Sequence, residues 1–156
     1  MERIASFSVD HTKLPVGMYL SRTDFGDIDT YDVRMKAPNA GEYLSTGAAH
    51  TFEHLFATYA RNSRFGPHVV YIGPMGCRTG CYLLVKGLPR VDAIALAREA
   101  MEFVRDFTGE IPGAKLEECG NYQDHDLPAA KRVAAEMAET LRGWTEEQLQ
   151  YAAYLA

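Results

Sequence analysis

The chain has 156 residues, of which 47% are hydrophobic and 24% are charged, and its formal net charge is −5 at pH 7. This apolar content is typical of a soluble globular protein and excludes an intrinsically disordered chain, which lacks apolar surface to bury. The acidic balance argues against nucleic-acid binding, because phosphate recognition draws on clustered lysines and arginines.

Alternation of apolar and polar residues predicts β-strands in the first third of the chain. The pattern is clearest in residues 30–36, where Tyr31, Val33 and Met35 would face one side of a half-buried strand. Further candidates are rich in β-branched and aromatic residues and are bounded by Gly, Pro or Asp. They cover residues 4–9, 17–21, 69–72 and 81–86. We therefore expect a sheet of four or five strands.

Helical patterns follow in other parts of the chain. They cover residues 48–61, 91–107 and 128–142, with a short fourth helix that opens at Thr145. Ser45 and Thr46 are N-cap candidates for the first helix, and Gly143 is the expected stop of the third. Gln148 can complete a capping box at the start of the fourth.

The order of these elements indicates the fold class. Strands follow one another rather than alternating strictly with helices, which favours an α+β arrangement over a Rossmann fold. No linker long enough to separate two domains interrupts the chain. We expect a single domain, residues 1–156, with an antiparallel sheet of four or five strands and about four helices packed against it.

A His-x-x-Glu-His pattern lies inside the first expected helix. At about 100° per residue, an α-helix places His50, Glu53 and His54 within a wedge roughly 100° wide. Two histidines one turn apart can hold one divalent ion, and a carboxylate between them can join the ligands or act as a base. Cys119, which precedes the flexible Gly120, is the candidate third ligand.

These residues also have other interpretations. The two histidines can face solvent on an ordinary helix, and Cys119 can be a small buried hydrophobe. The same pattern occurs in inverted zincin metallopeptidases, whose third ligand is a carboxylate. The chain is short for a peptidase with a substrate cleft, so a peptidase is the second interpretation.

The three cysteines, Cys77, Cys81 and Cys119, favour thiol chemistry or metal ligation over a disulfide framework, because their number is odd and no export signal precedes them. The sequence has neither a signal-peptide core nor an apolar run of bilayer length, so we expect a cytoplasmic protein without membrane association. Cys77 stands between glycines and beside Arg78, which can favour the thiolate. The alternative is a turn that buries Cys77, and we expect Cys81 in the core.

Several short segments stand out together, in an order that spans most of the chain. They are SFSVDH (residues 6–11), YDVR (31–34) with APN (37–39), HTFEH (50–54), PMGCRTG (74–80), and CG (119–120) followed by HDL (125–127). Each is modest alone, but in this order they resemble the S-ribosylhomocysteine lyase family, LuxS. The resemblance implies an α+β fold and cleavage of S-ribosylhomocysteine to homocysteine and 4,5-dihydroxy-2,3-pentanedione, the precursor of autoinducer-2.

The resemblance also implies a ligand set and two catalytic residues. One divalent metal, usually Fe(II) with Zn or Co tolerated, would be held by His50, His54 and Cys119. Glu53 and Cys77 would be the residues that move protons.

For substrate binding, the resemblance implies that Ser6, His11 and Arg34 contact a small sugar thioether. It further implies a homodimer with shared active sites, in which the N-terminal segment crosses to the other subunit. The products connect such an enzyme with quorum sensing and the methionine cycle.

The chain departs from the family pattern just before Pro74. Where the family commonly has Asp-Ile-Ser, this chain has Tyr71-Ile72-Gly73, so an acidic group near the pocket is missing. If that acid holds the amino group of the substrate, affinity or preference differs here. A metal-binding module without catalysis is therefore the third interpretation.

Overall fold

Four strands form one antiparallel sheet in the computed structural model, which describes residues 1–155. They are β1 (Gly17–Asp24), β2 (Ile28–Arg34), β3 (Val69–Pro74) and β4 (Gly80–Lys86). The order across the sheet is β1-β2-β4-β3, and each neighbouring pair is antiparallel. Two hairpins are thus joined through β2 and β4.

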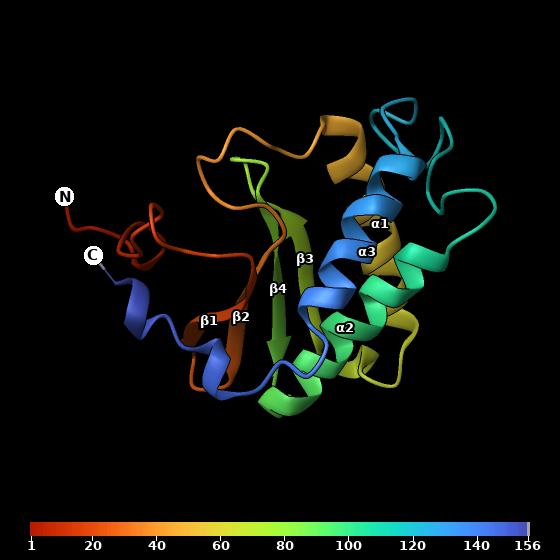
Figure 1. Cartoon of the computed structure of the whole chain (residues 1–156). Coiled ribbons are helices and arrows are strands. Elements are labelled where there is room, and N and C mark those ends of the chain that lie inside the picture. Colours follow the sequence, from red (N-terminus) through yellow and green to blue (C-terminus); the bar gives the residue numbers. More distant parts are fainter. Residues whose placement is uncertain (156) are drawn as a thin grey trace.

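Three α-helices cover one face of this sheet (Figure 1). They are α1 (Thr46–Asn62), α2 (Arg90–Asp106) and α3 (Leu127–Thr140). Ser45 caps α1 by accepting a hydrogen bond from the Ala48 N–H at 3.1 Å, and Asp126 caps α3 by accepting one from Ala129 at 3.0 Å. Both helices begin at the end of the molecule where the loop between α2 and α3 lies (Figure 1).

The apolar core fills the space between the sheet and the helices. Tyr31 and Val33 of β2 are fully buried there, together with Leu55 and Phe56 of α1. Burying side chains of this size contributes about 1.5–3 kcal/mol each. This packing fixes the orientation of α1 against the sheet, and with it the opposite face of α1, which carries the histidines.

The two chain ends cover the other face of the sheet. Figure 1 shows both termini on the side away from the helices. The Trp144 indole donates a hydrogen bond to the Met18 carbonyl at 2.9 Å, and the Tyr151 hydroxyl donates one to Asp32. The alternation predicts a half-buried β2, but these contacts leave Asp32 and Arg34 only 0% and 3% exposed.

The α+β class with an antiparallel sheet is confirmed, but the strand expected over residues 4–9 is wrong. Ala5–Phe7 forms a 3-10 helix, and only Val9 pairs, through a single antiparallel bridge to Leu155. The Ser8 hydroxyl donates a hydrogen bond to the Ile4 carbonyl at 3.4 Å. Local bonds of this kind offer the backbone an alternative to strand pairing.

The fourth expected helix is a 3-10 helix, Glu147–Leu149, and its capping box is present. The Thr145 N–H donates to the Gln148 side-chain oxygen at 2.9 Å, and the Gln148 N–H donates to the Thr145 hydroxyl at 3.4 Å. Further 3-10 helices cover Gly66–His68 and Ala152–Tyr154.

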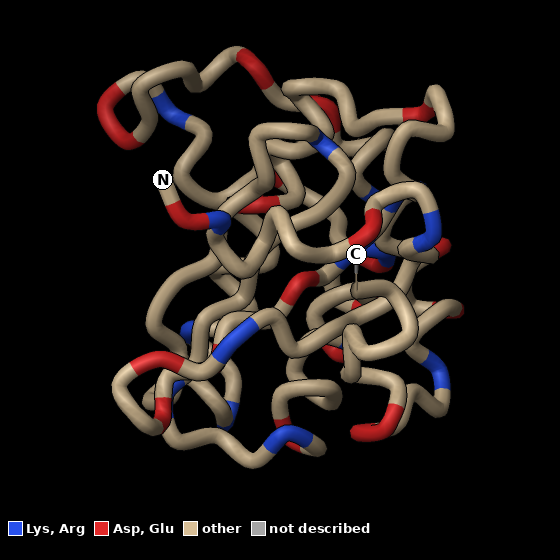
Figure 2. The backbone as a smooth tube through the Cα atoms, turned by 90° about the vertical axis from the view of Figure 1, so that its left-hand side faces the viewer, with Lys and Arg blue, Asp and Glu red and all other residues tan. Residues whose placement is uncertain are grey.

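None of the helices within residues 1–155 has both the length and the apolar character needed to span a bilayer. On the side of the molecule that carries the termini, acidic and basic positions are interspersed rather than separated by sign (Figure 2).

Candidate metal centre and active site

The first half of α1 presents two histidines to one side. The ring centroids of His50 and His54 are 4.5 Å apart, and the rings are nearly perpendicular, with an interplanar angle of 88°. The spacing of one helical turn produces this pair, as the sequence predicts. Glu53, which lies between the two histidines in the sequence, is half-buried.

Backbone carbonyls of the loop between α2 and α3 hold both rings. Nδ1 of His50 lies 2.8 Å from the Asp124 carbonyl oxygen, and Nδ1 of His54 lies 2.7 Å from that of Pro112. A carbonyl oxygen can only accept, so each Nδ1 carries the hydrogen and each Nε2 keeps its lone pair. This is the arrangement in which a histidine ligates a metal through Nε2.

Gly113 makes the close approach of this loop to α1 possible. Its φ of 71° lies in the left-handed region, and a Cβ atom at this position would be 3.2 Å from Nδ1 of His54. A side chain here would therefore be strained by the backbone and would press against the ring.

Cys119 reaches the two histidines from the same loop. Its Sγ lies 3.4 Å from Nε2 of His50 and 3.5 Å from the Asn121 N–H, which donates to it. The donor atoms of His50, His54, Cys119 and one further histidine, His125, all lie within 4.8 Å of one another. Neutral imidazoles with one thiolate suit Zn, Fe(II) and Co(II), so the residues present fit one divalent ion of this kind.

His125 is the residue of this cluster that sequence reasoning did not assign. Its ring stacks on His50, with centroids 4.1 Å apart and an interplanar angle of 20°, and its Nδ1 lies 3.0 Å from the Thr51 hydroxyl. Its Nε2 is buried without a hydrogen-bond partner among residues 1–155. Burial lowers the pKa of His125, and the neighbouring imidazoles of His50 and His54 lower it further, so the ring is neutral at pH 7.

A hollow of about 290 Å³ connects the cluster with the loop that precedes β4. Its lining comes from two elements, the start of α1 and the β3–β4 loop, and comprises Thr46, Ala49, His50, Glu53, Pro74, Met75, Gly76 and Arg78. Glu53 therefore shares one cavity with a candidate metal ligand, where it can exchange protons with a molecule bound there.

Cys77 lies in the β3–β4 loop and is exposed, which rules out the alternative of a buried turn cysteine. Its Sγ lies 3.0 Å from the Thr79 hydroxyl and 3.8 Å from Nη1 of Arg34. Arg34 is thus a cation beside the thiol. Arg78, which the sequence suggests for this role, donates from its Nη1 to the Leu44 carbonyl at 3.3 Å, and its effect on Cys77 stays a prediction.

Cys81 occupies the core, as the sequence predicts. It is fully buried in β4, and burial raises the pKa of its thiol well above the usual range. Cys81 is therefore inert, whereas Cys77 and Cys119 are accessible thiols.

The candidate substrate contacts do not gather at the cluster within one chain. Ser6 and His11 belong to the N-terminal segment, which lies across the sheet from α1 (Figure 1). Nδ1 of His11 is 2.8 Å from the Val9 carbonyl oxygen. The Arg34 guanidinium is buried beside Cys77, where it donates to Thr79 at 2.8 Å.

The two departures at positions 71 and 73 are linked in space. A Cβ atom on Gly73 would lie 2.6 Å from Cζ of the Tyr71 ring, so the ring occupies the space of a side chain at position 73. Tyr71 itself is 55% exposed on the edge strand β3. In this conformation the Tyr71 ring thus takes the place of a side chain at position 73.

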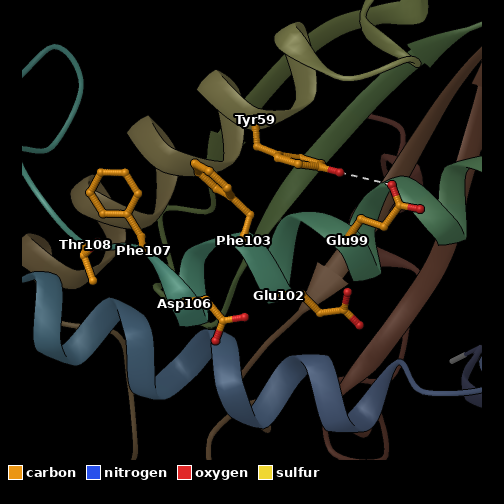
Figure 3. Close-up of a pocket in the computed structure, with 7 residues that line it drawn as sticks. All are labelled: Tyr59, Glu99, Glu102, Phe103, Asp106, Phe107 and Thr108. Atoms are coloured by element: carbon orange, nitrogen blue, oxygen red, sulfur yellow. Dashed lines mark hydrogen bonds between the residues drawn. The ribbon is translucent and has the colours of Figure 1, made fainter.

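A larger hollow, of about 560 Å³, lies away from the cluster between α1 and α2 (Figure 3). It is lined by acidic and aromatic residues, namely Tyr59, Glu99, Glu102, Phe103, Asp106, Phe107 and Thr108. Glu99 is already engaged, because it accepts hydrogen bonds from Tyr59 at 3.1 Å and from Arg64 at 2.7 Å. Volume alone therefore does not identify the active site, because the larger of the two hollows contains none of the candidate metal ligands.

The α+β fold and the histidine–thiol cluster together define a small metalloprotein whose ligands come from one helix and one loop. The family model of S-ribosylhomocysteinase (LuxS) matches residues 4–148. The chain belongs to this family, which confirms the resemblance. The third donor is a thiol, so the carboxylate that an inverted zincin would need in its place is not part of this cluster.

Three relatives show the extent of the similarity. S-ribosylhomocysteine lyase from Clostridium acetobutylicum is 46% identical, over 97% of this chain and 99% of the relative. The enzyme of the same name from Phocaeicola vulgatus is 48% identical, over 97% and 98%. That from Porphyromonas gingivalis is 45% identical, over 97% and 99%.

Proposed function

We propose that this protein is a metal-dependent S-ribosylhomocysteine lyase, a carbon–sulfur lyase that releases homocysteine and 4,5-dihydroxy-2,3-pentanedione. The observation that carries the proposal is the convergence of His50, His54 and Cys119, far apart in sequence, beside the Glu53 cavity. Family membership over residues 4–148 supports the choice of substrate. The second product links the protein to autoinducer synthesis and quorum sensing, and homocysteine links it to the methionine cycle.

The three ligands His50, His54 and Cys119 would hold one divalent ion. When bound, such an ion supplies Lewis acidity that stabilises negative charge developing on the sugar oxygens. Imidazole and thiolate donors suit Fe(II), Zn and Co(II) alike, and we assign Fe(II) as the native ion because of the family resemblance.

In this proposal, Glu53 and Cys77 carry out the proton transfers of the reaction. The C5–S bond of the substrate is not activated until a carbonyl stands at C3, so protons must first move between carbon and oxygen at C1, C2 and C3. We assign the carbon-centred transfers to Cys77, which is exposed, and the oxygen-linked transfers to Glu53, which lines the cavity.

Carbon–sulfur cleavage follows by β-elimination. Glu53 removes the C4 proton, the electron pair of that bond forms the C4–C5 double bond, and homocysteine leaves as its thiolate. No electron is lost or gained overall, so the reaction needs no redox partner.

A homodimer with shared active sites is part of the proposal. The N-terminal segment lies across the sheet from α1 of its own chain, so Ser6 and His11 would serve the cluster of a second subunit. Ile4 and Phe7 of this segment are 56% and 64% exposed, which provides apolar contact area for a partner. Arg34 would complete the substrate contacts beside Cys77.

We further propose that the whole chain acts as one lyase domain in the cytoplasm, on a small molecule and not on nucleic acid or membranes. The single antiparallel sheet, with helices packed against it, supports one domain.

Release of a free thiol from S-ribosylhomocysteine, followed with a thiol reagent, tests the activity. We expect release by the metal-loaded protein, loss after chelation, and a loss of about 100-fold to 10,000-fold in Glu53→Ala with the metal content unchanged. Glu102→Ala, in the hollow between α1 and α2, is the matched control and should remain active. If the metal-loaded protein cleaves peptides and leaves the sugar thioether intact, and Cys77→Ala stays active, the lyase assignment is wrong.

A further inference from the structure

The three histidines of the cluster differ in what holds their Nδ1 atoms. His50 and His54 face carbonyl oxygens, which only accept, whereas His125 faces the hydroxyl of Thr51. A hydroxyl can donate or accept, so the tautomer of His125 depends on where the hydrogen of Thr51 is directed.

The surroundings of Thr51 decide this direction. Thr51 is fully buried on α1, and its Oγ1 already accepts a hydrogen bond from the Asp126 N–H at 2.9 Å. Among residues 1–155, Nδ1 of His125, at 3.0 Å, is the one acceptor within reach of its hydrogen. Leaving a buried hydroxyl without an acceptor costs about 1–3 kcal/mol. Thr51 therefore donates to Nδ1, and the ring hydrogen of His125 is on Nε2.

The Nε2–H of His125 cannot bind a metal, because that nitrogen has no free lone pair. The arrangement of the rings independently indicates that His125 is not a metal ligand. The His50 and His125 rings are stacked, with centroids 4.1 Å apart and planes inclined by 20°, so an ion in the plane of the His50 ring lies outside the plane of the His125 ring. A nitrogen lone pair lies in the ring plane, and two stacked imidazoles are poor ligands for one ion.

One ligand atom of each of the four residues lies within 4.8 Å of the others. With the tautomers above, the cluster offers the Nε2 lone pairs of His50 and His54, the sulfur of Cys119 and the buried Nε2–H of His125. An N–H that faces a cation is repelled unless a negatively polarised atom lies between them. The atom that suits both is an oxygen bound next to the cation.

We propose that His125 is a catalytic hydrogen-bond donor, whose Nε2–H binds a sugar oxygen of the substrate next to the metal, and that Thr51 is the positioning residue that fixes its tautomer. The inference rests on the proposed lyase function and adds a residue to it. The donor is strongest where charge develops on that oxygen, so it acts mainly on kcat.

Nitrogen–proton NMR correlation on the zinc-loaded protein tests the tautomer without any turnover. We expect His50 and His54 with Nε2 bound to zinc, and His125 with a hydrogen on Nε2 and none on Nδ1. In Thr51→Val the preference for this tautomer should be lost, whereas Thr51→Ser, which keeps the hydroxyl, should retain it. Zinc on Nε2 of His125, or a hydrogen on its Nδ1, overturns the inference.

Kinetics on the Co(II)-loaded protein test the role. His125→Ala should lower kcat about 100-fold to 1,000-fold with KM nearly unchanged and one metal still bound per chain. His125→Gln, whose amide N–H can replace the Nε2–H, should recover most of this loss. A kcat within threefold of wild type in folded His125→Ala contradicts the proposal. If wild type itself releases no thiol, the lyase function is what fails, and the tautomer measurement still shows whether His125 is a ligand or a donor.

Discussion

Two groups of polar side chains, one half-buried and one fully buried, lie on opposite sides of the sheet and differ in their chemistry. The metal-donor cluster consists of three imidazoles and a thiol. Nδ1 of His50 and Nδ1 of His54 are bonded to backbone carbonyls, which leaves the Nε2 atoms available. The second group is the buried ion pair of Asp32 and Arg34, to which the Tyr151 hydroxyl donates a further hydrogen bond. Opposite charges therefore hold the second group together, whereas the first group offers ring nitrogens and a sulfur to a cation.

The second group holds the C-terminal segment on the sheet. Arg34 Nη2 donates to Asp32 at 2.6 Å, and both side chains are at most 4% exposed. Burial lowers the pKa of Arg34, but the charge of Asp32, the hydrogen bond to it and smaller contributions from other neighbours together outweigh this, so the net pKa is raised and the guanidinium stays charged. Removing a partner from this group should damage the fold, whereas removing a donor from the metal cluster should damage function alone.

The largest effect that separates the two groups is expected for Cys119→Ala. Without the thiolate donor the chain should no longer retain a metal, and thiol release should fall at least about 1,000-fold. Cys119 is only half-buried, so the metal-free variant should unfold within about 1 kcal/mol of the metal-free wild type. Metal analysis, the thiol assay and urea unfolding measure the three quantities.

Cys81→Ala is the matched control for Cys119→Ala. It removes a thiol from the core, so it should lower stability while leaving the metal content at one per chain. Full metal retention in Cys119→Ala would show that the cluster is not the metal site.

The opposite outcome is expected for Asp32→Asn. This change leaves the Arg34 charge buried without its counter-ion, which should lower the free energy of unfolding by about 3–5 kcal/mol. Metal content should not change in the protein that remains folded. As a control, Asp27→Asn breaks an exposed pair with Lys86 and should cost less than about 1 kcal/mol. Equal effects of the two substitutions would contradict the structural role of the buried pair.

A smaller effect is expected in the pH dependence of stability. Burial raises the pKa of Tyr151, and the charge of Asp32 raises it further. A raised folded-state pKa stabilises the fold below the unfolded value of about 10, and this contribution is lost as the pH rises above it. Tyr151 should therefore contribute a loss of up to about 1.4 kcal/mol per pH unit above pH 10.

Urea unfolding between pH 8 and pH 11 checks this effect. Tyr151→Phe should be less stable at pH 8, because its hydrogen bond to Asp32 is gone, and should lose stability less steeply above pH 10. Tyr19 and Tyr31 also have raised pKa values through burial, so part of the slope should remain. A slope unchanged by the substitution would mean that Tyr151 does not contribute to it.

Local periodicity accounts for what the sequence could predict. One helical turn separates His50 from His54, so their pairing is a property of α1 alone. The alternation in residues 30–36 likewise predicts which side of β2 carries Tyr31 and Val33. These features need no knowledge of distant segments.

Contacts between distant segments account for what it could not predict. The burial of Asp32 and Arg34 depends on Tyr151, more than one hundred residues away in the chain. His125 joins the cluster because its loop hydrogen bonds to Thr51, and no spacing rule links these two positions. The failure of the expected strand at 4–9 has the same origin, since strand pairing depends on an available partner.

The loop between α2 and α3, which carries Cys119, is attached to α1 at both of its ends. His50 donates from Nδ1 to the Asp124 carbonyl, and His54 donates from Nδ1 to the Pro112 carbonyl, which leaves each Nε2 for the metal. The loop is thus ordered when the chain folds, so metal binding does not bear the conformational entropy cost of ordering it. A chain stripped by a chelator keeps its donors in place, so it can refill from solution without refolding.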